Sequence, residues 1–231
     1  ARRVHRRMSR LPSLFDVRDW PTKLVAKAVT PGENKRLFGY SIEEALARSC
    51  NLSVMLYLSL TGEVPDRPNL RRFEVGMWFA SALSIESAPV HAAALTRMCG
   101  STPTAIQSVA ATALPDLSRV EVAEHFSTVQ GFLGGGDCAP QDAFDGEVAA
   151  RLLAALADEA PSSRASRQRV GRTCLVLLVL AESGLATREQ LERALVMARL
   201  PITTAEAFAA RSGRFMDDYP VHLPVVEYVE E

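Results

Sequence analysis

The chain has 231 residues and a formal net charge of -1, with 48% hydrophobic and 23% charged residues. This composition is typical of a folded globular protein, and the length allows one large domain or two small ones. The near-neutral charge argues against a general attraction to nucleic acid or to membrane surfaces, and no apolar run approaches the roughly 18 residues of a membrane span.

The amino-terminal end is predicted to be a basic tail followed by a small hairpin. Residues 1–19 include five arginines among the first ten positions, and a charge run of this kind is typical of a solvated segment. No apolar core follows the arginines, so we do not expect a secretory signal. Two β-compatible runs, Leu24–Thr30 and Lys35–Tyr40, flank the turn sequence Pro31-Gly32-Glu33-Asn34, which predicts a β-hairpin.

Helices are predicted for most of the remaining chain. Ser41 with Glu44 forms a capping box, so a helix is expected to begin at Ile42. A second helix is expected to end at Gly62 and Pro65, because glycine and proline commonly follow helix ends. Later apolar periodicity and capping residues predict helices over 69–85, from Pro89 to about Gly100, over 104–114, 120–133, 144–159 and 172–182, from the Thr187–Gln190 capping box to Arg199, and from Pro201 to about Gly213.

Two of these helices and the carboxy-terminal segment carry further expectations. Phe73 and Trp78 belong to a stripe at helical spacing, which predicts a core-facing surface. The alanine-rich helix over 104–114 has small side chains that permit close helix contacts, either in the centre of the protein or at a subunit interface. Residues 215–231 contain two prolines and many β-branched side chains, and they predict an extended arm. The expected fold class is therefore all-α, with a small amino-terminal β-hairpin and an extended carboxy-terminal arm.

Several motifs together resemble the citrate synthase superfamily. The stretch Phe38–Pro65 has the family order of Gly-Tyr, an acidic helix, an apolar helix and Gly-Glu-Val-Pro. Trp20–Lys23 is similar to the segment before the hairpin in short citryl-CoA-lyase-like members. His91–Arg97 with the following Gly-Ser-Thr, and Leu195–Pro201, resemble later family motifs. This resemblance implies a citrate-synthase-like multi-helix bundle over residues 20–231, with a small subdomain near 120–185.

The resemblance also implies a chemistry and shows where its residues are missing. Family members join or split a carbon–carbon bond beside a CoA thioester, using an Asp as base and two His as donors to developing negative charge. One family His aligns with Ser87, and the family base aligns with Gly171. The turn Gly134–Asp137 has no His in the place of the second donor. A citrate-synthase-like pseudoenzyme is the interpretation that these substitutions favour.

Other residues near these positions are candidates for a remodelled site. The candidate catalytic residues are Ser87, His91, His125 and Asp137, although a His at helical spacing is also typical of a surface or hydrogen-bonded core position. Arg199 matches the family arginine that faces a substrate carboxylate, and it could equally be a structural ion-pair partner. We expect no metal, because Cys50, Cys99, Cys138 and Cys174 lie far apart without metal-ligand spacing.

Two main hypotheses follow for function. The first is a citrate-synthase-like protein without the His/His/Asp set, acting as a non-catalytic or accessory subunit that dimerises through its helices, with itself or with an intact citrate-synthase-like subunit. The second is an active CoA-thioester carbon–carbon lyase or synthase with a remodelled site. A helical interaction protein without an acyl-CoA ligand is a third reading. We expect a cytoplasmic protein that requires no cofactor and has acyl-CoA and carboxylic acids as candidate ligands.

Overall fold

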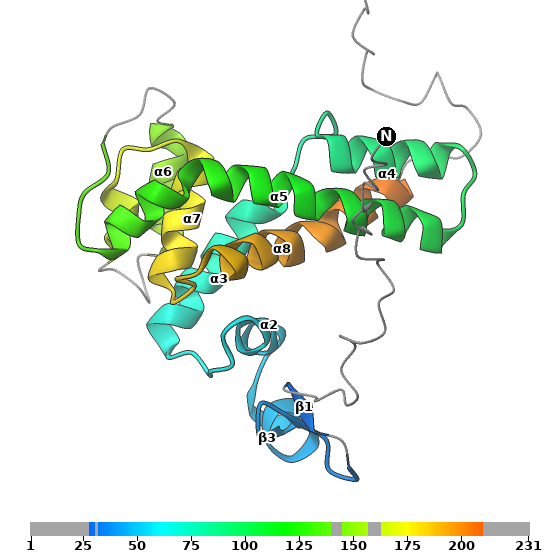
Figure 1. Cartoon of the computed structure of the whole chain (residues 1–231), viewed down its shortest axis with the longest axis horizontal. Helices are drawn as coiled ribbons and strands as arrows, with labels where there is room; N and C mark the ends of the chain where they lie inside the picture. The colour runs from blue at the N-terminus through cyan, green and yellow to red at the C-terminus, as the bar shows by residue number, and fades with distance from the viewer. Residues whose placement is uncertain (1–27, 31, 140–144, 157–162, 210–231) are drawn as a thin grey trace, which may run out of the picture.

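The computed structural model describes residues 28–30, 32–139, 145–156 and 163–209. The predicted basic tail and the predicted carboxy-terminal arm lie outside the described residues, as does the first part of the predicted Leu24–Thr30 strand. The described chain is mostly helical, with a small sheet at its amino-terminal end (Figure 1). The predicted fold class is thus confirmed for a helical protein with a small β element.

The sheet has three short antiparallel strands: β1 Val29–Thr30, β2 Arg36–Leu37 and β3 Tyr40–Ser41. Their order is β1-β2-β3, so the predicted hairpin gains a third strand. The turn between β2 and β3 consists of Phe38 and Gly39, whose φ angles are 49° and 87°. Positive φ at both residues is what the tight type I′ hairpin turn requires, and it explains the glycine of the Gly-Tyr motif.

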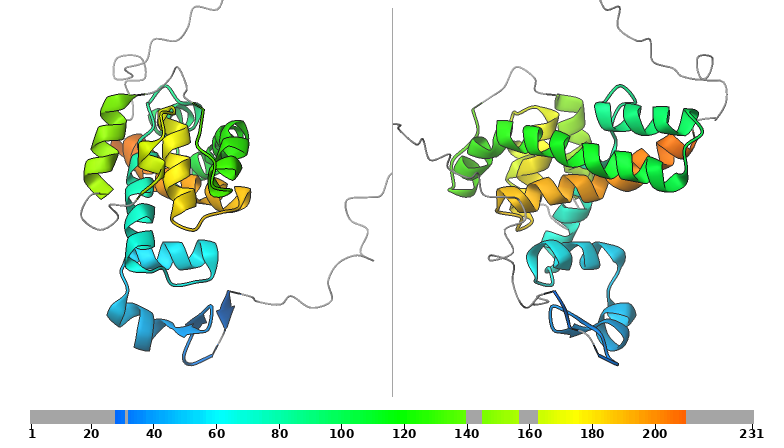
Figure 2. Two further views of the ribbon diagram at one scale, coloured as in Figure 1. Left: turned by 90° about the vertical axis from the view of Figure 1, so that its left-hand side faces the viewer. Right: turned by 45° about the vertical axis from the view of Figure 1, so that its right-hand side comes forward.

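The helices begin and end close to most of the predicted limits. A π-helix spans Ile42–Leu46 and a 3₁₀ helix spans Ala165–Arg167. The α-helices are α1 Ala47–Ser49, α2 Leu52–Thr61, α3 Arg67–Ser81, α4 Ala88–Met98, α5 Pro103–Leu133, α6 Gly146–Leu156, α7 Arg172–Glu182 and α8 Arg188–Ala209. In both figures α2 lies between the small sheet, which has the π-helix and α1 beside it, and the helices from α3 onward (Figures 1 and 2).

Hydrogen bonds at two predicted capping boxes explain where their helices begin. The Ser41 hydroxyl accepts from the backbone N–H of Glu44 at 3.1 Å, at the start of the π-helix. At the start of α8 the box is reciprocal: Thr187 accepts from Gln190 N–H at 3.2 Å, and the Gln190 side chain accepts from Thr187 N–H at 3.1 Å. Each bond satisfies a backbone donor that a helix terminus leaves unpaired.

Two predicted helix breaks are wrong. The expected end at residue 114 falls inside α5, and the expected break before Pro201 falls inside α8. Pro115 and Pro201 are both exposed, so the carbonyl that each ring leaves without its helical donor can reach water. Packing then keeps both helices continuous past their prolines, because α5 and α8 run side by side and contact one another along the bundle (Figure 1).

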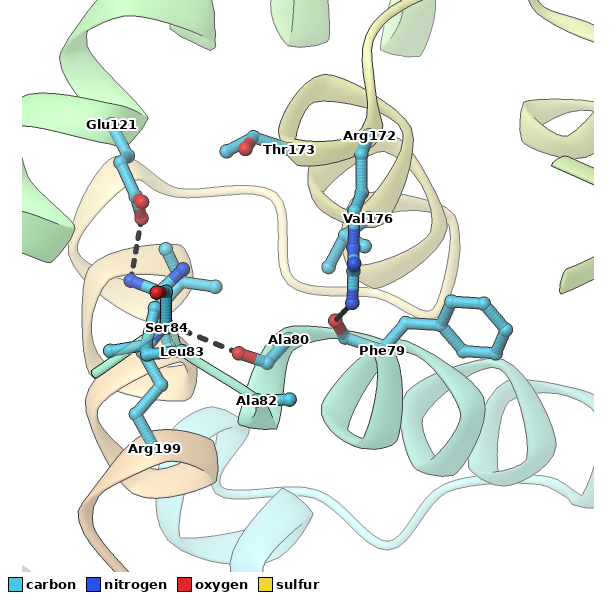
Figure 3. Close-up of a pocket in the computed structure, with 11 residues that line it drawn as sticks. Phe79, Ala80, Ala82, Leu83, Ser84, Glu121, Arg172, Thr173, Val176 and Arg199 are labelled. Carbon is cyan, nitrogen blue, oxygen red and sulfur yellow. Dashed lines mark hydrogen bonds and ion pairs between the residues drawn. The ribbon is translucent and has the colours of Figure 1, made fainter. Parts of the chain in front are cut away.

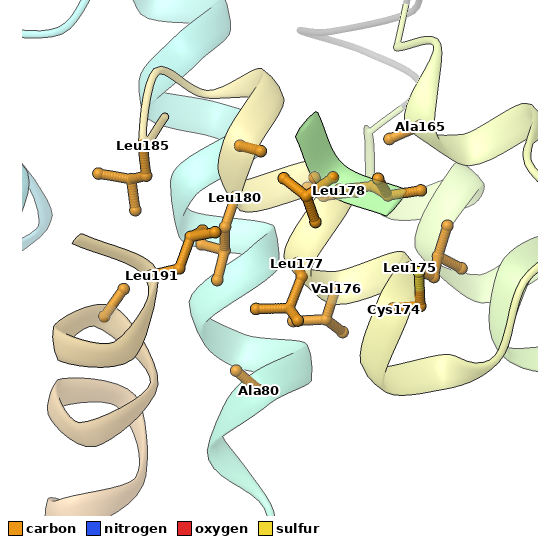
Figure 4. Close-up of a cluster of buried hydrophobic side chains, with 14 of the residues drawn as sticks. Ala80, Ala165, Cys174, Leu175, Val176, Leu177, Leu178, Leu180, Leu185 and Leu191 are labelled. Atoms are coloured by element: carbon orange, nitrogen blue, oxygen red, sulfur yellow. The ribbon is translucent and has the colours of Figure 1, made fainter. Parts of the chain in front are cut away.

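The core is organised around α7. Every residue from Cys174 to Ala181 is buried, and the helix packs against α3, α5 and α6 (Figure 4). Gly76 permits the close approach of α3, since a Cβ there would lie 2.7 Å from Leu180 Cδ2. The segment before α7 is hydrogen-bonded to the carboxy-terminal end of that helix. Glu182, the last residue of α7, accepts from Ser163 Oγ at 2.6 Å and from the backbone N–H of Arg164 at 2.7 Å.

The predicted aromatic stripe on α3 only partly faces the core. Phe73 is buried and its ring meets the Tyr57 ring edge-on, with centroids 5.3 Å apart. Trp78, in contrast, keeps 73% of its surface exposed, so its predicted burial is wrong. It lies five residues after Phe73, which rotates it away from the α7-facing side of the helix.

Candidate functional site: a polar pocket between α3, α5, α7 and α8

A polar pocket of about 180 Å³ lies where four helices meet (Figure 3). Its walls are the carboxy-terminal end of α3 with the loop to Ser84, the middle of α5, the first two turns of α7, and α8. These walls converge because α3 and α5 pack against α7 while α8 packs against α3 and α5. The polar side chains that line the pocket are Ser84, Glu121, Arg172, Thr173 and Arg199.

Arg199 is the buried cation of this pocket, with only 5% of its surface exposed. Its Nη1 lies 2.5 Å from Glu121 Oε2 and 3.5 Å from Ser118 Oγ, and its Nε donates to the Ala80 carbonyl at 3.2 Å. The Ala80 carbonyl is in the last turn of α3, where carbonyls have no helical donor. A buried guanidinium needs such partners, so Arg199 joins α3, α5 and α8 as a structural ion pair.

The rim of the pocket is formed by the start of α7. Arg172 is the first residue of that helix, it is exposed, and its Nη2 donates to the Phe79 carbonyl at 3.4 Å. Gly171 precedes it as the helix cap, and no side-chain hydrogen bond caps the helix. A helix amino terminus carries partial positive charge. The described residues that line the pocket bring two guanidinium groups and one carboxylate, so they give it an excess of positive charge.

Ser87 and His91, on the amino-terminal side of α4, are not among the residues that line the pocket. The Ser87 hydroxyl donates to the Ser84 carbonyl at 2.6 Å, which closes the loop before α4. His91 is half-buried in the first turn of α4, and its backbone N–H donates to the Ser87 carbonyl. Ser87 therefore has a local structural contact within the described chain.

His125 and Asp137 do not line the pocket either. His125 lies one turn after Glu121 on α5 and is half-buried. Asp137 is exposed beyond the end of α5, where it accepts from Gln168 Nε2 at 3.2 Å. The same Gln168 side chain accepts from the Cys138 N–H at 2.8 Å, so Asp137 belongs to a loop-to-loop contact. Of the five candidate side chains, Arg199 alone lines this pocket.

Glu121 and Ser118 were missed as site residues by the sequence reasoning. The signal for them was the buried series Ile106, Ala110, Leu114, Ser118 and Val122, which recurs every four residues without interruption at Pro115. Such spacing is typical of one continuous helix face. This spacing places the polar Ser118 among buried positions and Glu121 beside them. Both side chains are accounted for by Arg199, which contacts each of them.

Other reactive groups lie away from the pocket. Burial raises the pKa of the Tyr57 hydroxyl, the Cys138 thiol and the Cys174 thiol, and none of these three lines it. Among the described residues, no group of three or more His, Cys, Asp or Glu side chains is placed to hold a metal ion. None of the described helices is long and apolar enough to cross a membrane.

Comparison with known protein families and with curated proteins gives no sequence match. Comparison with solved structures does give matches. Citryl-CoA lyase from Hydrogenobacter thermophilus superposes with a TM-score of 0.60 at 14% identity, covering 90% of this chain and 96% of that one. The chain has the citrate-synthase-like fold. The resemblance drawn from the motifs is thus supported at the level of fold.

Two ATP citrate lyase structures give similar matches. One is the D541A mutant from Methanosaeta concilii in complex with (3S)-citryl-CoA, and the other is the enzyme from Methanothrix soehngenii with citrate and coenzyme A. Each has a TM-score of 0.55 at 12% identity and covers 97% of this chain. The present chain spans about half, 47%, of those longer chains.

Proposed function

We propose that this chain is a citrate-synthase-like protein without the His/His/Asp catalytic set, and that it acts as a non-catalytic subunit. The observation that carries this proposal is the composition of the polar pocket. Among the described residues, Glu121 is the only acid that lines it, and Glu121 is bonded to Arg199. The residue that aligns with the family base is Gly171, at the cap of α7 beside the pocket. Glycine has no side chain with which to remove a proton.

The missing donors also favour a non-catalytic role. Enolate formation beside a thioester needs hydrogen-bond donors aimed at the developing negative charge, and losing one donor typically costs about 10²–10³-fold in rate. Ser87, which aligns with one family His, donates its hydroxyl to the Ser84 carbonyl instead. Where the second His would follow the alanine-rich helix, α5 continues without a turn to Leu133. The scaffold therefore offers few groups for the family reaction.

The experiment compares ligand binding and turnover of the purified chain. Calorimetric titration with acetyl-CoA, citryl-CoA and oxaloacetate should show no tight binding. Formation of oxaloacetate from citryl-CoA, and release of the CoA thiol from acetyl-CoA in the presence of oxaloacetate, should both stay at the rate of the buffer. An intact citryl-CoA lyase, assayed in parallel, is the positive control.

Robust turnover would instead favour the second hypothesis, a CoA-thioester lyase or synthase with a remodelled site. Glu121 would then be the first acid to test, because it is the carboxylate that faces the pocket. In that case Glu121→Gln should abolish turnover. An unchanged rate in that variant would place the chemistry elsewhere in the chain.

Pairing with a second copy of the chain is part of the same proposal. The exposed large apolar side chains include Leu52 and Met55 on α2, Trp78 on α3 and Ile202 on α8. Burying them against another chain would remove them from water, and the family resemblance implies pairing through helices. The free state of all four cysteines supports a reducing, cytoplasmic compartment.

A further inference from the structure

We propose that Glu121 acts as an internal carboxylate ligand for Arg199, so that the pocket is a carboxylate-binding site filled by the chain's own side chain. This inference rests on the proposed function, because it explains what takes up the pocket's buried cation when no substrate is turned over. The chemical class of the external ligand that could replace Glu121 is a small carboxylate, such as acetate.

The geometry of the Glu121–Arg199 pair supports this assignment. Glu121 Oε2 approaches Arg199 Nη1 to 2.5 Å, and the two residues are 78 positions apart in the chain. The other bonds of Arg199 go to the neutral Ala80 carbonyl and the Ser118 hydroxyl. Among its bonding partners, Glu121 is therefore the one that supplies negative charge (Figure 3). A charge-assisted bond of this kind is stronger than a bond to a neutral acceptor.

The exposure of the two side chains shows how a small anion gains access to Arg199. The Arg199 side chain keeps 6% of its surface exposed, whereas the Glu121 side chain keeps 21%. The pair faces a hollow of about 180 Å³ that is also lined by Arg172 and Thr173. A small anion can therefore reach Arg199 from the Glu121 side if that carboxylate is removed. The space left by truncating Glu121 adds to the hollow.

The charge of the surroundings also favours an anion beside Arg199. Without Glu121, the pocket would contain the guanidinium groups of Arg172 and Arg199 beside the amino terminus of α7. A buried unpaired cation is unfavourable, and the positive helix end adds to the attraction for an anion. The empty position is thus expected to recruit a free carboxylate in place of the missing side chain.

The test is chemical rescue of Glu121→Ala. The variant should melt at a lower temperature than the wild type in chloride buffer. Sodium acetate at matched ionic strength should raise the melting temperature of the variant in proportion to the logarithm of its concentration once that exceeds the Kd, by about 5–10 °C at roughly 100 times the Kd. The wild type should show no such acetate-specific rise. Failure of acetate to act differently from chloride on the variant would overturn the proposal.

Three controls make the result specific. Glu121→Gln keeps the side-chain volume and is expected to fold with a lowered melting temperature but without acetate rescue, because the amide fills the space. The double variant Glu121→Ala with Arg199→Met should also lack rescue, since the cation is gone. Glu147→Ala removes one partner of the exposed Glu147–Arg151 pair on α6 and should behave like the wild type in both salts.

The remaining outcomes also support or contradict the proposal. If Glu121→Ala folds only in acetate, the proposal is supported. If Glu121→Ala folds in neither salt while Glu121→Gln folds, a free carboxylate cannot replace the side chain, and the proposal is wrong. Rescue of Glu121→Gln as strongly as of the alanine variant would likewise contradict it. Turnover by the wild type would overturn the proposed function without altering the rescue result, so the two failures are distinguishable.

Discussion

The thiol of Cys174 lies fully buried on α7, within the helix that forms the centre of the core. Burial raises its pKa from an ordinary 9.0 to about 12, and nearby Cys138 contributes in the same direction. Because water stabilises the thiolate far better than the core does, the folded chain holds this proton more tightly than the unfolded chain. The consequence is a dependence of stability on alkaline pH.

We predict that the free energy of unfolding falls as the pH rises from about 9 towards 12, with Cys174 contributing at most about 1.4 kcal/mol per pH unit. Below the unfolded pKa both states hold the proton, so this contribution is constant there. Urea unfolding under reducing conditions measures the slope, which should be shallower in Cys174→Ala. Cys99→Ala, at an exposed position, is the control, and equal slopes in both variants would contradict the assignment.

At the scale of elements, the contact between α3 and α7 depends on a residue without a side chain. A Cβ on Gly76 would lie 2.7 Å from Cδ2 and 2.9 Å from Cγ of Leu180. Leu180 is fully buried in the core, so it has little room to move away. The glycine is therefore retained in a helix interior where alanine has the higher intrinsic propensity.

Gly76→Ala should lower the free energy of unfolding by about 1–2 kcal/mol, because overpacking costs more than the helix propensity gains. Gly131→Ala on α5 is the matched control, since a Cβ there would meet no atom within 4 Å. That variant should be unchanged or up to about 1 kcal/mol more stable. Urea midpoints of the two variants measure the difference, and a stabilised Gly76→Ala would show that α3 and α7 do not pack this closely.

At the scale of the whole molecule, an exposed apolar surface remains on α2, α3 and α8. Trp78 is 73% exposed, Leu52 66% and Ile202 41%, and all three line one hollow between α2, α3 and α8. Interfaces are commonly dominated by a few residues, among which tryptophan is enriched. Trp78 is therefore the side chain at which self-association is best tested.

We predict that the purified chain self-associates and that Trp78→Ser raises the dissociation constant at least about tenfold, a change of about 1.4 kcal/mol. Sedimentation equilibrium over a dilution series measures it. Val120→Ser, at a position on α5 that is 60% exposed, is the control. A wild type that stays monomeric would contradict self-pairing, and co-expression with an intact citrate-synthase-like chain would then show whether a mixed pair forms.

Features that depend on neighbours in the sequence were predictable. The hydroxyl of Ser41 bonds the N–H three residues later, and Thr187 with Gln190 does the same, so the pattern alone locates these helix starts. The hairpin and the apolar helix over 172–182 were also predictable, because turn residues and apolar runs act through neighbours in the sequence. The limits of the proposed subdomain near 120–185 stay a prediction.

Tertiary contacts decided the rest. Sequence rules place a break at Pro115 and at Pro201, but packing between α5 and α8 keeps both helices continuous. The Arg199–Glu121 pair joins positions 78 residues apart, and no local pattern specifies such a partner. By itself the sequence determined the helical scaffold, because caps and periodicity act within a few residues. The structure alone decided that Arg199 is bound by Glu121, because a buried charge is paired by whatever group the fold brings beside it.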